Sequence, residues 1–131
     1  MEILHPPGYV RPKGYSNGVA ARGKMVFVAG QVGWDKNEIF QTDDIAGQAR
    51  QSLTTIVAIL AEAGAKPEHI VRMTWYVGDK DEYNANLKNI GIAYRDVIGR
   101  EFSAMTAIQV GGFVEKGAKL EIEATAVIPD E

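Results

Sequence analysis

The chain has 131 residues, which is enough to enclose a hydrophobic core without disulfides, because a domain of this size buries roughly two thirds of its unfolded surface. Its composition of 46% hydrophobic and 24% charged residues is that of an ordinary globular protein, and we expect one domain over residues 1–131. The net charge of −3, with acidic and basic residues interspersed, argues against nucleic acid as the main partner, since phosphate binding usually needs a basic stripe.

The scarce residue types exclude several kinds of chemistry. The chain has no cysteine, which excludes disulfides, thiolate metal sites and a cysteine nucleophile. Its only histidines, His5 and His69, have no partners at ligand spacing, so we expect no metal site. The N-terminus does not resemble a signal peptide, and no apolar run approaches the roughly 18 residues of a membrane span. We therefore expect a cytoplasmic protein without membrane contact.

The first third of the chain predicts a loop and then strands. Residues 5–18 hold three prolines, three glycines and an Asn-Gly pair, which are typical of turns. Residues 19–34 predict two strands that turn at Arg22-Gly23-Lys24 as a hairpin. The second of them, over 25–30, is nearly all apolar and predicts a central strand covered on both sides. Residues 34–42 form a polar connection.

Residues 43–64 predict the clearest helix of the chain. Its apolar residues recur at spacings of three and four and form one continuous stripe. Asp43 and Asp44 stand at the start, where carboxylates complement the helix dipole, and Gly64 stands at the end. The stripe consists of Ile45, Ala49, Leu53, Ile56, Leu60 and Ala63.

A strand and a second helix follow. Residues 69–79 are rich in strand-forming residue types. Asp79 or Asp81 can then cap a helix whose apolar stripe lies within 83–97 and which stops at Gly99.

Two further strands, over 104–110 and 119–128, give the order β-β-β-α-β-α-β-β. Two helices with broad apolar stripes must cover one face of a sheet, so we expect a two-layer α+β domain. The helical crossovers favour some parallel pairing. The sequence therefore predicts two helices on one face of a mixed six-stranded sheet.

The stretch KLEIEATAVI, residues 119–128, alternates between two faces. Leu120 and Ile122 fall on the face that the helices would cover, whereas Glu121 and Glu123 fall on the other. That second face mixes polar with apolar side chains, and self-association is the simplest way to cover it. The residues we expect there are Glu121, Glu123, Thr125, Met105, Ala107, Gln109, Met25, Phe27, Trp75 and Val127.

Four stretches of the chain resemble the RidA (YjgF) family of reactive-intermediate deaminases. They are VFVAGQVGWD, GQARQSLTTIVAILAEAGAKPEHIVRMTWYVGD, SAMTAIQVGG and KLEIEATAV, and the resemblance runs from about Tyr15 to Val127. It implies a chorismate-mutase-like fold and a homotrimer with clefts for small-molecule ligands between subunits. It also implies hydrolysis of imines and enamines to ketones or keto acids and ammonia, without a metal or cofactor. Other names in the family refer to endoribonuclease activity or translation inhibition.

The resemblance implies a set of site residues as well. Glu121, the first glutamate of EIEA, would hold the attacking water or transfer protons. Trp34, on a loop beside the strand-end Gly-Gln pair, is a further candidate for ligand contact. The substrate-binding residues matched by position are Tyr15, Ala29, Gly30, Gln31, Met105 and Ala107.

Position 105 departs from the family motif of proline, alanine, arginine and a small residue. The chain reads Ser-Ala-Met-Thr over 103–106, so the arginine that would fork onto a substrate carboxylate is absent. Its loss would remove about 1.5–3 kcal/mol, or about ten- to a hundredfold in affinity. Either another cation replaces it or the ligand lacks a carboxylate, and we favour a larger or uncharged imine or enamine. The candidate cations are Arg11, Lys13, Arg22 and Arg100.

Three functional interpretations follow. The first is a cofactor-free imine or enamine deaminase that uses Glu121. The second is a non-catalytic trimer that binds a small metabolite or regulates, which the methionine at 105 supports. The third is an endoribonuclease. The net negative charge and the absence of a histidine acid/base pair argue against it. Structural interpretations remain beside these: an ion-paired Glu121, a Tyr15 that packs on the body of the protein, and a Gly30 that only permits a bulge or strand end.

Overall fold

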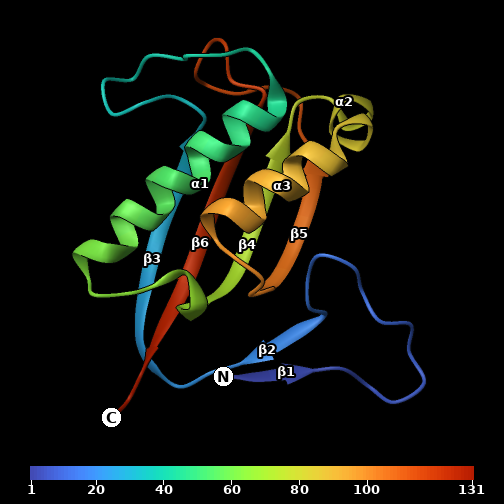
Figure 1. The fold of residues 1–131 in the computed structure, drawn as a ribbon, viewed down its shortest axis with the longest axis vertical. Coiled ribbons are helices and arrows are strands. Elements are labelled where there is room, and N and C mark those ends of the chain that lie inside the picture. The colour runs from blue at the N-terminus through green and yellow to red at the C-terminus, as the bar shows by residue number, and fades with distance from the viewer.

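A computed structural model describes residues 1–131 and shows an α+β architecture (Figure 1). The helices lie together on one face of a sheet, and a short two-stranded ribbon lies apart from it near the N-terminus. In chain order the elements are β1 (Glu2–Leu4), β2 (Gly18–Ala20), β3 (Gly23–Val32), α1 (Ile45–Glu62), the 3₁₀ turn η1 (Pro67–His69), β4 (Ile70–Val77), α2 (Lys80–Ala85), α3 (Leu87–Val97), β5 (Ala104–Gln109) and β6 (Leu120–Pro129).

The main sheet has four strands in the order β3–β6–β4–β5. β4 and β5 are parallel, because α2 and α3 carry the chain back across the sheet, and the other two pairs are antiparallel. The expected mixed pairing is therefore confirmed. The expected six-stranded sheet is wrong, because β1 and β2 pair with each other in a separate ribbon.

The hairpin expected over 19–34 is also wrong. β2 pairs with β1, whereas β3 pairs with β6, so the turn between β2 and β3 joins two different sheets. At that turn Gly23 has a φ of +147°, and a Cβ there would collide with the carbonyl of Ile128. β3 consequently lies at the edge of the sheet, although its apolar sequence is typical of a central strand.

The helix expected over 43–64 is confirmed as α1. The carboxylate of Asp44 caps its start by accepting a hydrogen bond from the backbone N–H of Gly47 at 2.9 Å. Gly64, with a φ of +77°, follows its end. The stripe packs against the sheet, with Ala49, Leu53, Ile56 and Leu60 fully buried.

The second expected helix is divided in two. Asp79 caps α2 by accepting hydrogen bonds from two backbone N–H groups. Asn86, at φ −115° and ψ 16°, then interrupts the helical backbone before α3 begins. The break divides the predicted stripe, because Ile90 and Tyr94 are buried whereas Leu87 remains 50% exposed.

The face of the sheet that carries the helices holds the core. Three pairs of residues stand opposite one another on β4 and β6, and none of the six side chains is more than 4% exposed. Trp75 is one of them, so it lies in the core and not on the open face as we expected. The pairs are Met73–Ala124, Trp75–Ile122 and Val77–Leu120.

Three residues of β5 share this helix side. Met105, Ala107 and Gln109 stand in register with the core residues of β4, and Gln109 accepts a hydrogen bond from the backbone N–H of Lys80 in α2 at 2.8 Å. The expectation that these three share a face with Glu121 is therefore wrong. The pairing of β5 with β4 decides which face the β5 side chains take, and a register shifted by one residue would turn all of them to the opposite face.

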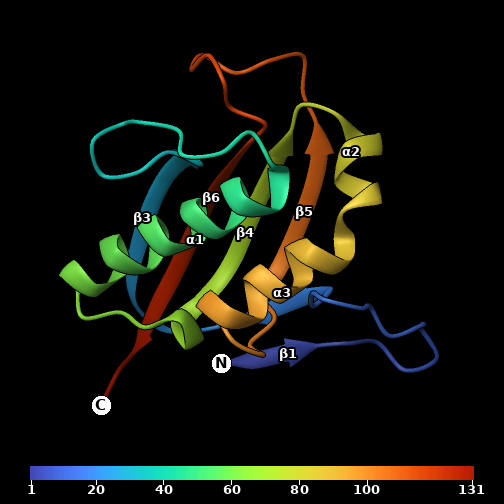
Figure 2. The same ribbon diagram turned by 45° about the horizontal axis from the view of Figure 1, so that its top comes forward.

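The opposite face of the sheet has no helix over it, and we call it the open face (Figure 2). Glu121, Glu123 and Thr125 alternate with the core residues of β6 and are half-buried there, as the sequence predicts. Met25 and Phe27 lie in register with this side of β6 and are 57% and 71% exposed. None of the helices combines the length and apolar character needed to cross a membrane.

Candidate active site on the open face

A pocket of about 320 Å³ lies on the open face, where β3, β4 and β6 approach the connection between β5 and β6. Figures 1 and 2 show this connection, the orange-red loop, above one end of the sheet. We call this cavity the Glu121 pocket. Its lining consists of Gly30, Tyr76, Val110, Gly112, Phe113, Val114, Glu121 and Glu123.

A β-bulge in β3 forms one side of this pocket. The register with β6 shifts between Val28 and Gln31, which leaves Ala29 and Gly30 outside the regular ladder. A Cβ at Gly30 would collide with the carboxylate of Glu121, so only glycine lets that carboxylate lie directly over the backbone. The bulge interpretation of Gly30 is therefore confirmed, and the bulge places a polar backbone segment beside Glu121.

The side chain of Gln31 stabilises the bulge. Its Nε2 donates a hydrogen bond to the carbonyl oxygen of Ala29 at 3.0 Å. This contact closes a short ring around Gly30. The predicted residues Ala29, Gly30, Gln31 and Glu121 thus lie together, with Gly30 and Glu121 lining the pocket itself.

Glu121 forms no ion pair in the chain, and the ion pairs present all involve other carboxylates. Within the chain its carboxylate is therefore not held by a cation, contrary to the structural interpretation of this residue. A carboxylate that lines an open pocket and is not neutralised by a cation can accept a proton from water or hold a water molecule.

Tyr76 is a site residue that the sequence did not reveal. Its hydroxyl donates a hydrogen bond to Oε1 of Glu123, and in the register of β4 and β6 it stands opposite Glu121. This hydrogen bond, then burial and the charge of Glu123, raise the pKa of Tyr76 above its ordinary value. The phenol therefore stays protonated at neutral pH as a donor within the pocket. The alternation of side chains along β4 could have identified Tyr76, since it places Tyr76 on the face opposite Trp75.

Gln48, on α1, supports the pocket from the helix side. Its side chain is fully buried, and its Nε2 donates hydrogen bonds to the carbonyl oxygens of Thr42 at 3.1 Å and Gly117 at 2.9 Å. Its Oε1 accepts a hydrogen bond from the backbone N–H of Lys119 at 2.8 Å. One amide thus joins α1 to both loops at this end of the sheet, including the loop that closes the Glu121 pocket.

The remaining predicted residues lie elsewhere in the chain. Trp34 packs on Phe40, with ring centroids 5.5 Å apart, and does not line the Glu121 pocket. Tyr15 is 38% exposed and lines a small pocket of the N-terminal loop. Met105 and Ala107 lie on the helix side of β5, where Ala107 is exposed and Met105 packs against the core. One chain therefore does not bring these four residues to Glu121.

The candidate cations are also dispersed. Lys13 lines the same groove as Met105, and so does Arg95, which is not among the candidate cations. Arg11 lies in the small pocket of Tyr15. Arg22 and Arg100 line two other pockets near the β1–β2 ribbon.

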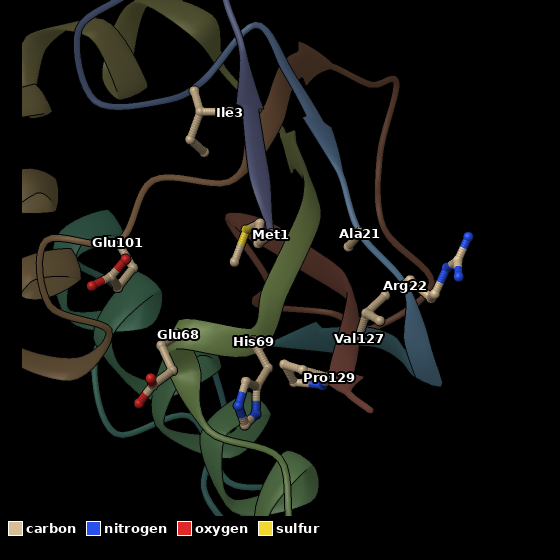
Figure 3. A pocket seen from close by; sticks show the side chains of 9 residues that line it. All are labelled: Met1, Ile3, Ala21, Arg22, Glu68, His69, Glu101, Val127 and Pro129. Carbon is tan, nitrogen blue, oxygen red and sulfur yellow. The ribbon is translucent and has the colours of Figure 1, made fainter. Parts of the chain in front are cut away.

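The pocket that contains Arg22 has a volume of about 350 Å³ and is shown in Figure 3. It lies where β3 begins and β6 ends, at the other end of the sheet from Gly30, and the side chain of Arg22 points outward from it. His69 lines it, with Nδ1 accepting a hydrogen bond from the backbone N–H of Lys66 at 2.9 Å. None of the predicted substrate-binding residues lines this pocket, and the chain holds no cluster of three potential metal ligands.

Solved structures of similar proteins share this architecture. The chain aligns with the Rid-family protein YyfB of Yersinia pestis with a TM-score of 0.85 and 29% identity, over 97% of this chain and 98% of that one. It aligns with TdcF of Escherichia coli, solved with bound serine, with a TM-score of 0.69 and 30% identity, over 98% and 99% of the two chains.

Sequence comparison gives the same assignment. The family model described as Endoribonuclease L-PSP matches residues 10–128. A 2-iminobutanoate/2-iminopropanoate deaminase of Salmonella typhimurium is 34% identical over 105 residues, which is 80% of each protein. The chain therefore belongs to the Endoribonuclease L-PSP family, the family of RidA and YjgF, as the four stretches of sequence predicted.

Proposed function

We propose that this protein is a cofactor-free hydrolase of a reactive imine or enamine, and that Glu121 is its acid/base group. One observation carries the proposal: the carboxylate of Glu121 lies over Gly30 at a β-bulge, in an open pocket and without an ion-pairing cation. Support also comes from the relatives, which include a 2-iminobutanoate/2-iminopropanoate deaminase.

The reaction we propose has two steps. Water adds its oxygen to the carbon of the C=N bond, while Glu121 accepts one of the water's protons and passes it to the nitrogen, which gives a neutral carbinolamine. Glu121 then accepts the proton of the new hydroxyl group and delivers it to the nitrogen as the C–N bond breaks, so that ammonia leaves and a ketone or keto acid remains. Water is the only co-reactant, and no electrons are transferred. The Tyr76 hydroxyl donates its proton to Glu123, so its oxygen can accept a hydrogen bond from the substrate, and the backbone of Gly30 lines the same pocket.

We further propose that the open face is buried in a homotrimer. Met25, Phe27 and Ile108 are more than half exposed, although aqueous surfaces seldom gather large apolar side chains on one sheet face. Tyr15, Met105 and Ala107 are separated from Glu121 within one chain, so a neighbouring copy is the only source from which they could join its pocket. The substrate site would then lie between subunits, as the family resemblance implies.

The test is the release of ammonia from 2-iminobutanoate generated in situ. We expect the wild type to accelerate it, and we expect Glu121→Gln to lose about 10²–10⁴-fold in kcat while keeping its thermal stability. Glu123→Gln is the matched control, because it removes the neighbouring carboxylate of the same strand and should retain more activity. Equal rates for wild type and Glu121→Gln would contradict the proposed role of Glu121.

A second candidate function is a trimer that binds a metabolite without converting it. The observation that favours it is Met105, which stands where the family motif has arginine. Met105→Arg separates the two candidates: under the enzyme proposal it should raise kcat/KM for 2-iminobutanoate about tenfold or more. If both proteins are inert, the binding function takes the place of the hydrolase.

A further inference from the structure

We infer that Tyr76 is a positioning residue of the Glu121 pocket, which holds the carboxylate of Glu123 where it binds the nitrogen of the substrate. This inference rests on the proposed hydrolase function and divides its work between two carboxylates. Glu121 moves the protons of the reaction, whereas Glu123 accepts hydrogen bonds from the N–H groups of the imine. The division starts from one contact, because the hydroxyl of Tyr76 is hydrogen-bonded to Glu123 and leaves Glu121 without such a donor.

The two carboxylates leave β6 towards different neighbouring strands. Glu121 and Glu123 are two residues apart on one face of β6, which separates their backbones by about 6–7 Å. β6 lies between β3 and β4 in the sheet. The carboxylate of Glu121 lies over Gly30 of β3, whereas Oε1 of Glu123 accepts its hydrogen bond from Tyr76 of β4. Both line the same pocket, so a substrate between them meets one carboxylate on each side.

The hydrogen bond of Tyr76 runs diagonally across the two strands. In the register of β4 and β6, Tyr76 stands opposite Glu121, and Thr74 stands opposite Glu123. Diagonal neighbours on one sheet face are within reach of an aromatic side chain. The hydrogen bond to Glu123, burial and the charge of Glu123 raise the pKa of Tyr76, and a hydrogen bond with Thr74 only partly opposes them. The phenol therefore keeps its proton, and with it the contact to Glu123, at neutral pH.

No cation of the chain competes with Tyr76 for Glu123. The pocket lining contains no lysine, arginine or histidine, and the ion pairs of the chain involve other carboxylates. Arg72 shares this face of β4, but it stands opposite Thr125. Without the hydroxyl of Tyr76, the carboxylate of Glu123 would lose its hydrogen-bond donor and could turn towards Glu121. Two adjacent carboxylates compete for the same proton, so Tyr76 also keeps Glu121 available for water.

The nitrogen of the substrate needs an acceptor of this kind. In the proposed reaction it carries N–H groups and gains a proton in each step, so it is most positive as ammonia leaves. Oε1 of Glu123 accepts a hydrogen bond from Tyr76, and the remaining lone pairs of the carboxylate can accept N–H groups of the substrate. A fixed anion placed where positive charge develops stabilises the transition state. Neither Tyr76 nor Glu123 gives up a proton, so the balance of the reaction is unchanged.

The experiment is a double-mutant cycle, with ammonia release from 2-iminobutanoate as the assay. We expect Tyr76→Phe and Glu123→Ala each to lower kcat about tenfold or more and to change KM less than about threefold, because the contact strengthens as the nitrogen becomes charged. In the Glu123→Ala background, Tyr76→Phe should cost less than about twofold more, since it has no carboxylate left to hold. Tyr9→Phe is the control, because Tyr9 is 69% exposed in the N-terminal loop, and it should leave kcat unchanged.

A second measurement does not depend on turnover. The NMR signal of the Tyr76 Cζ carbon should titrate at a higher pH in the wild type than in Glu123→Ala, because the hydrogen bond to Glu123 holds the phenol proton. Equal titration overturns the inference, and so does an unchanged kcat in Tyr76→Phe. The inference is also overturned if Tyr76→Phe costs as much without Glu123 as with it, since Tyr76 then acts on the substrate directly. A wild type that releases no ammonia overturns the proposed hydrolase and this role with it, whereas the three results above overturn only the role of Tyr76.

Discussion

The two faces of the four-stranded sheet differ although they share the same strands. On the helix side of β6, Leu120, Ile122 and Ala124 are at most 4% exposed and pack against the core. On the open face of the same strand, Glu121 and Glu123 are half-buried and line a pocket. The helix side therefore contributes packing energy, and the open face contributes carboxylates and a tyrosine hydroxyl that the fold does not need for its core.

The edge strand β3 shows the same contrast between the two faces. Phe27 of β3 is 71% exposed on the open face, whereas Val28, the next residue, is 4% exposed and belongs to the core. An exposed phenylalanine on an edge strand gives no stability to an isolated chain. It gains from burial only when another surface covers it, and this supports the proposed association of subunits through the open face.

The largest expected effect is a change in oligomeric state, which we expect from a substitution on the open face and not from one on the outer side of α1. Phe27→Asp would place a charge in the proposed subunit contact, and we expect the proposed trimer to dissociate entirely to monomers that keep the helical circular dichroism of the wild type. Sedimentation velocity measures this directly. Ile59→Asp is the control, because Ile59 lies on the outer side of α1 with 36% exposure, and it should leave the assembly intact. A Phe27→Asp protein that sediments like the wild type contradicts the assigned contact.

The next effect concerns the amide that joins the helix side to the pocket. Gln48→Leu would leave the carbonyls of Thr42 and Gly117 and the N–H of Lys119 without their buried partner. We expect a loss of about 2–4 kcal/mol in the free energy of unfolding, measured by urea denaturation. Gln51→Leu, one turn along α1, loses only a long contact of 3.5 Å to Thr55 and should cost less than about 1 kcal/mol. Similar losses for both variants would show that Gln48 holds neither loop.

The smallest effect is a pH dependence of the helix side. The pKa of Tyr94 is raised from 10.0 to about 12, so its contribution to stability is complete below pH 10 and is lost as the pH rises towards 12. This loss amounts to about 2 kcal/mol. Tyr94→Phe gives up the hydrogen bond to the carbonyl of Glu101, so it should be about 1 kcal/mol less stable at pH 7. Unfolding free energies from pH 7 to 12 should show this deficit shrink above pH 10 and reverse by pH 12, because the wild type alone loses the Tyr94 contribution, and a constant deficit would contradict the shift.

The sequence predicted the parts of the fold that rest on local patterns. The stripe of α1, its aspartate cap and its terminal glycine appear as expected, and so does the alternation of β6 that turns Glu121 away from the core. These features depend on residues close together in the chain. Helical and strand periods therefore express them directly.

The sequence did not predict features that depend on which distant strands pair. The apolar stretch of β3 indicated a central strand, but β3 lies at the edge of the sheet and pairs with β6 alone. The face assigned to Met105 was wrong for the same kind of reason, because β5 takes its register from β4. Of the site, the family match supplied Gly30 and Glu121, whereas Tyr76 and Gln48 emerge only from contacts between elements far apart in the sequence.

Neighbouring substitutions on β6 test the central claim most directly, because Glu121 and Ile122 belong to different faces of one strand. Kinetics with in situ 2-iminobutanoate and urea denaturation would be measured on Glu121→Gln and Ile122→Ala. We expect Glu121→Gln to lose turnover while its unfolding free energy changes by less than about 1 kcal/mol. We expect Ile122→Ala to lose about 2–5 kcal/mol of stability yet retain turnover under conditions where it is folded. Turnover that survives in Glu121→Gln would contradict the assignment of the open face as the catalytic side.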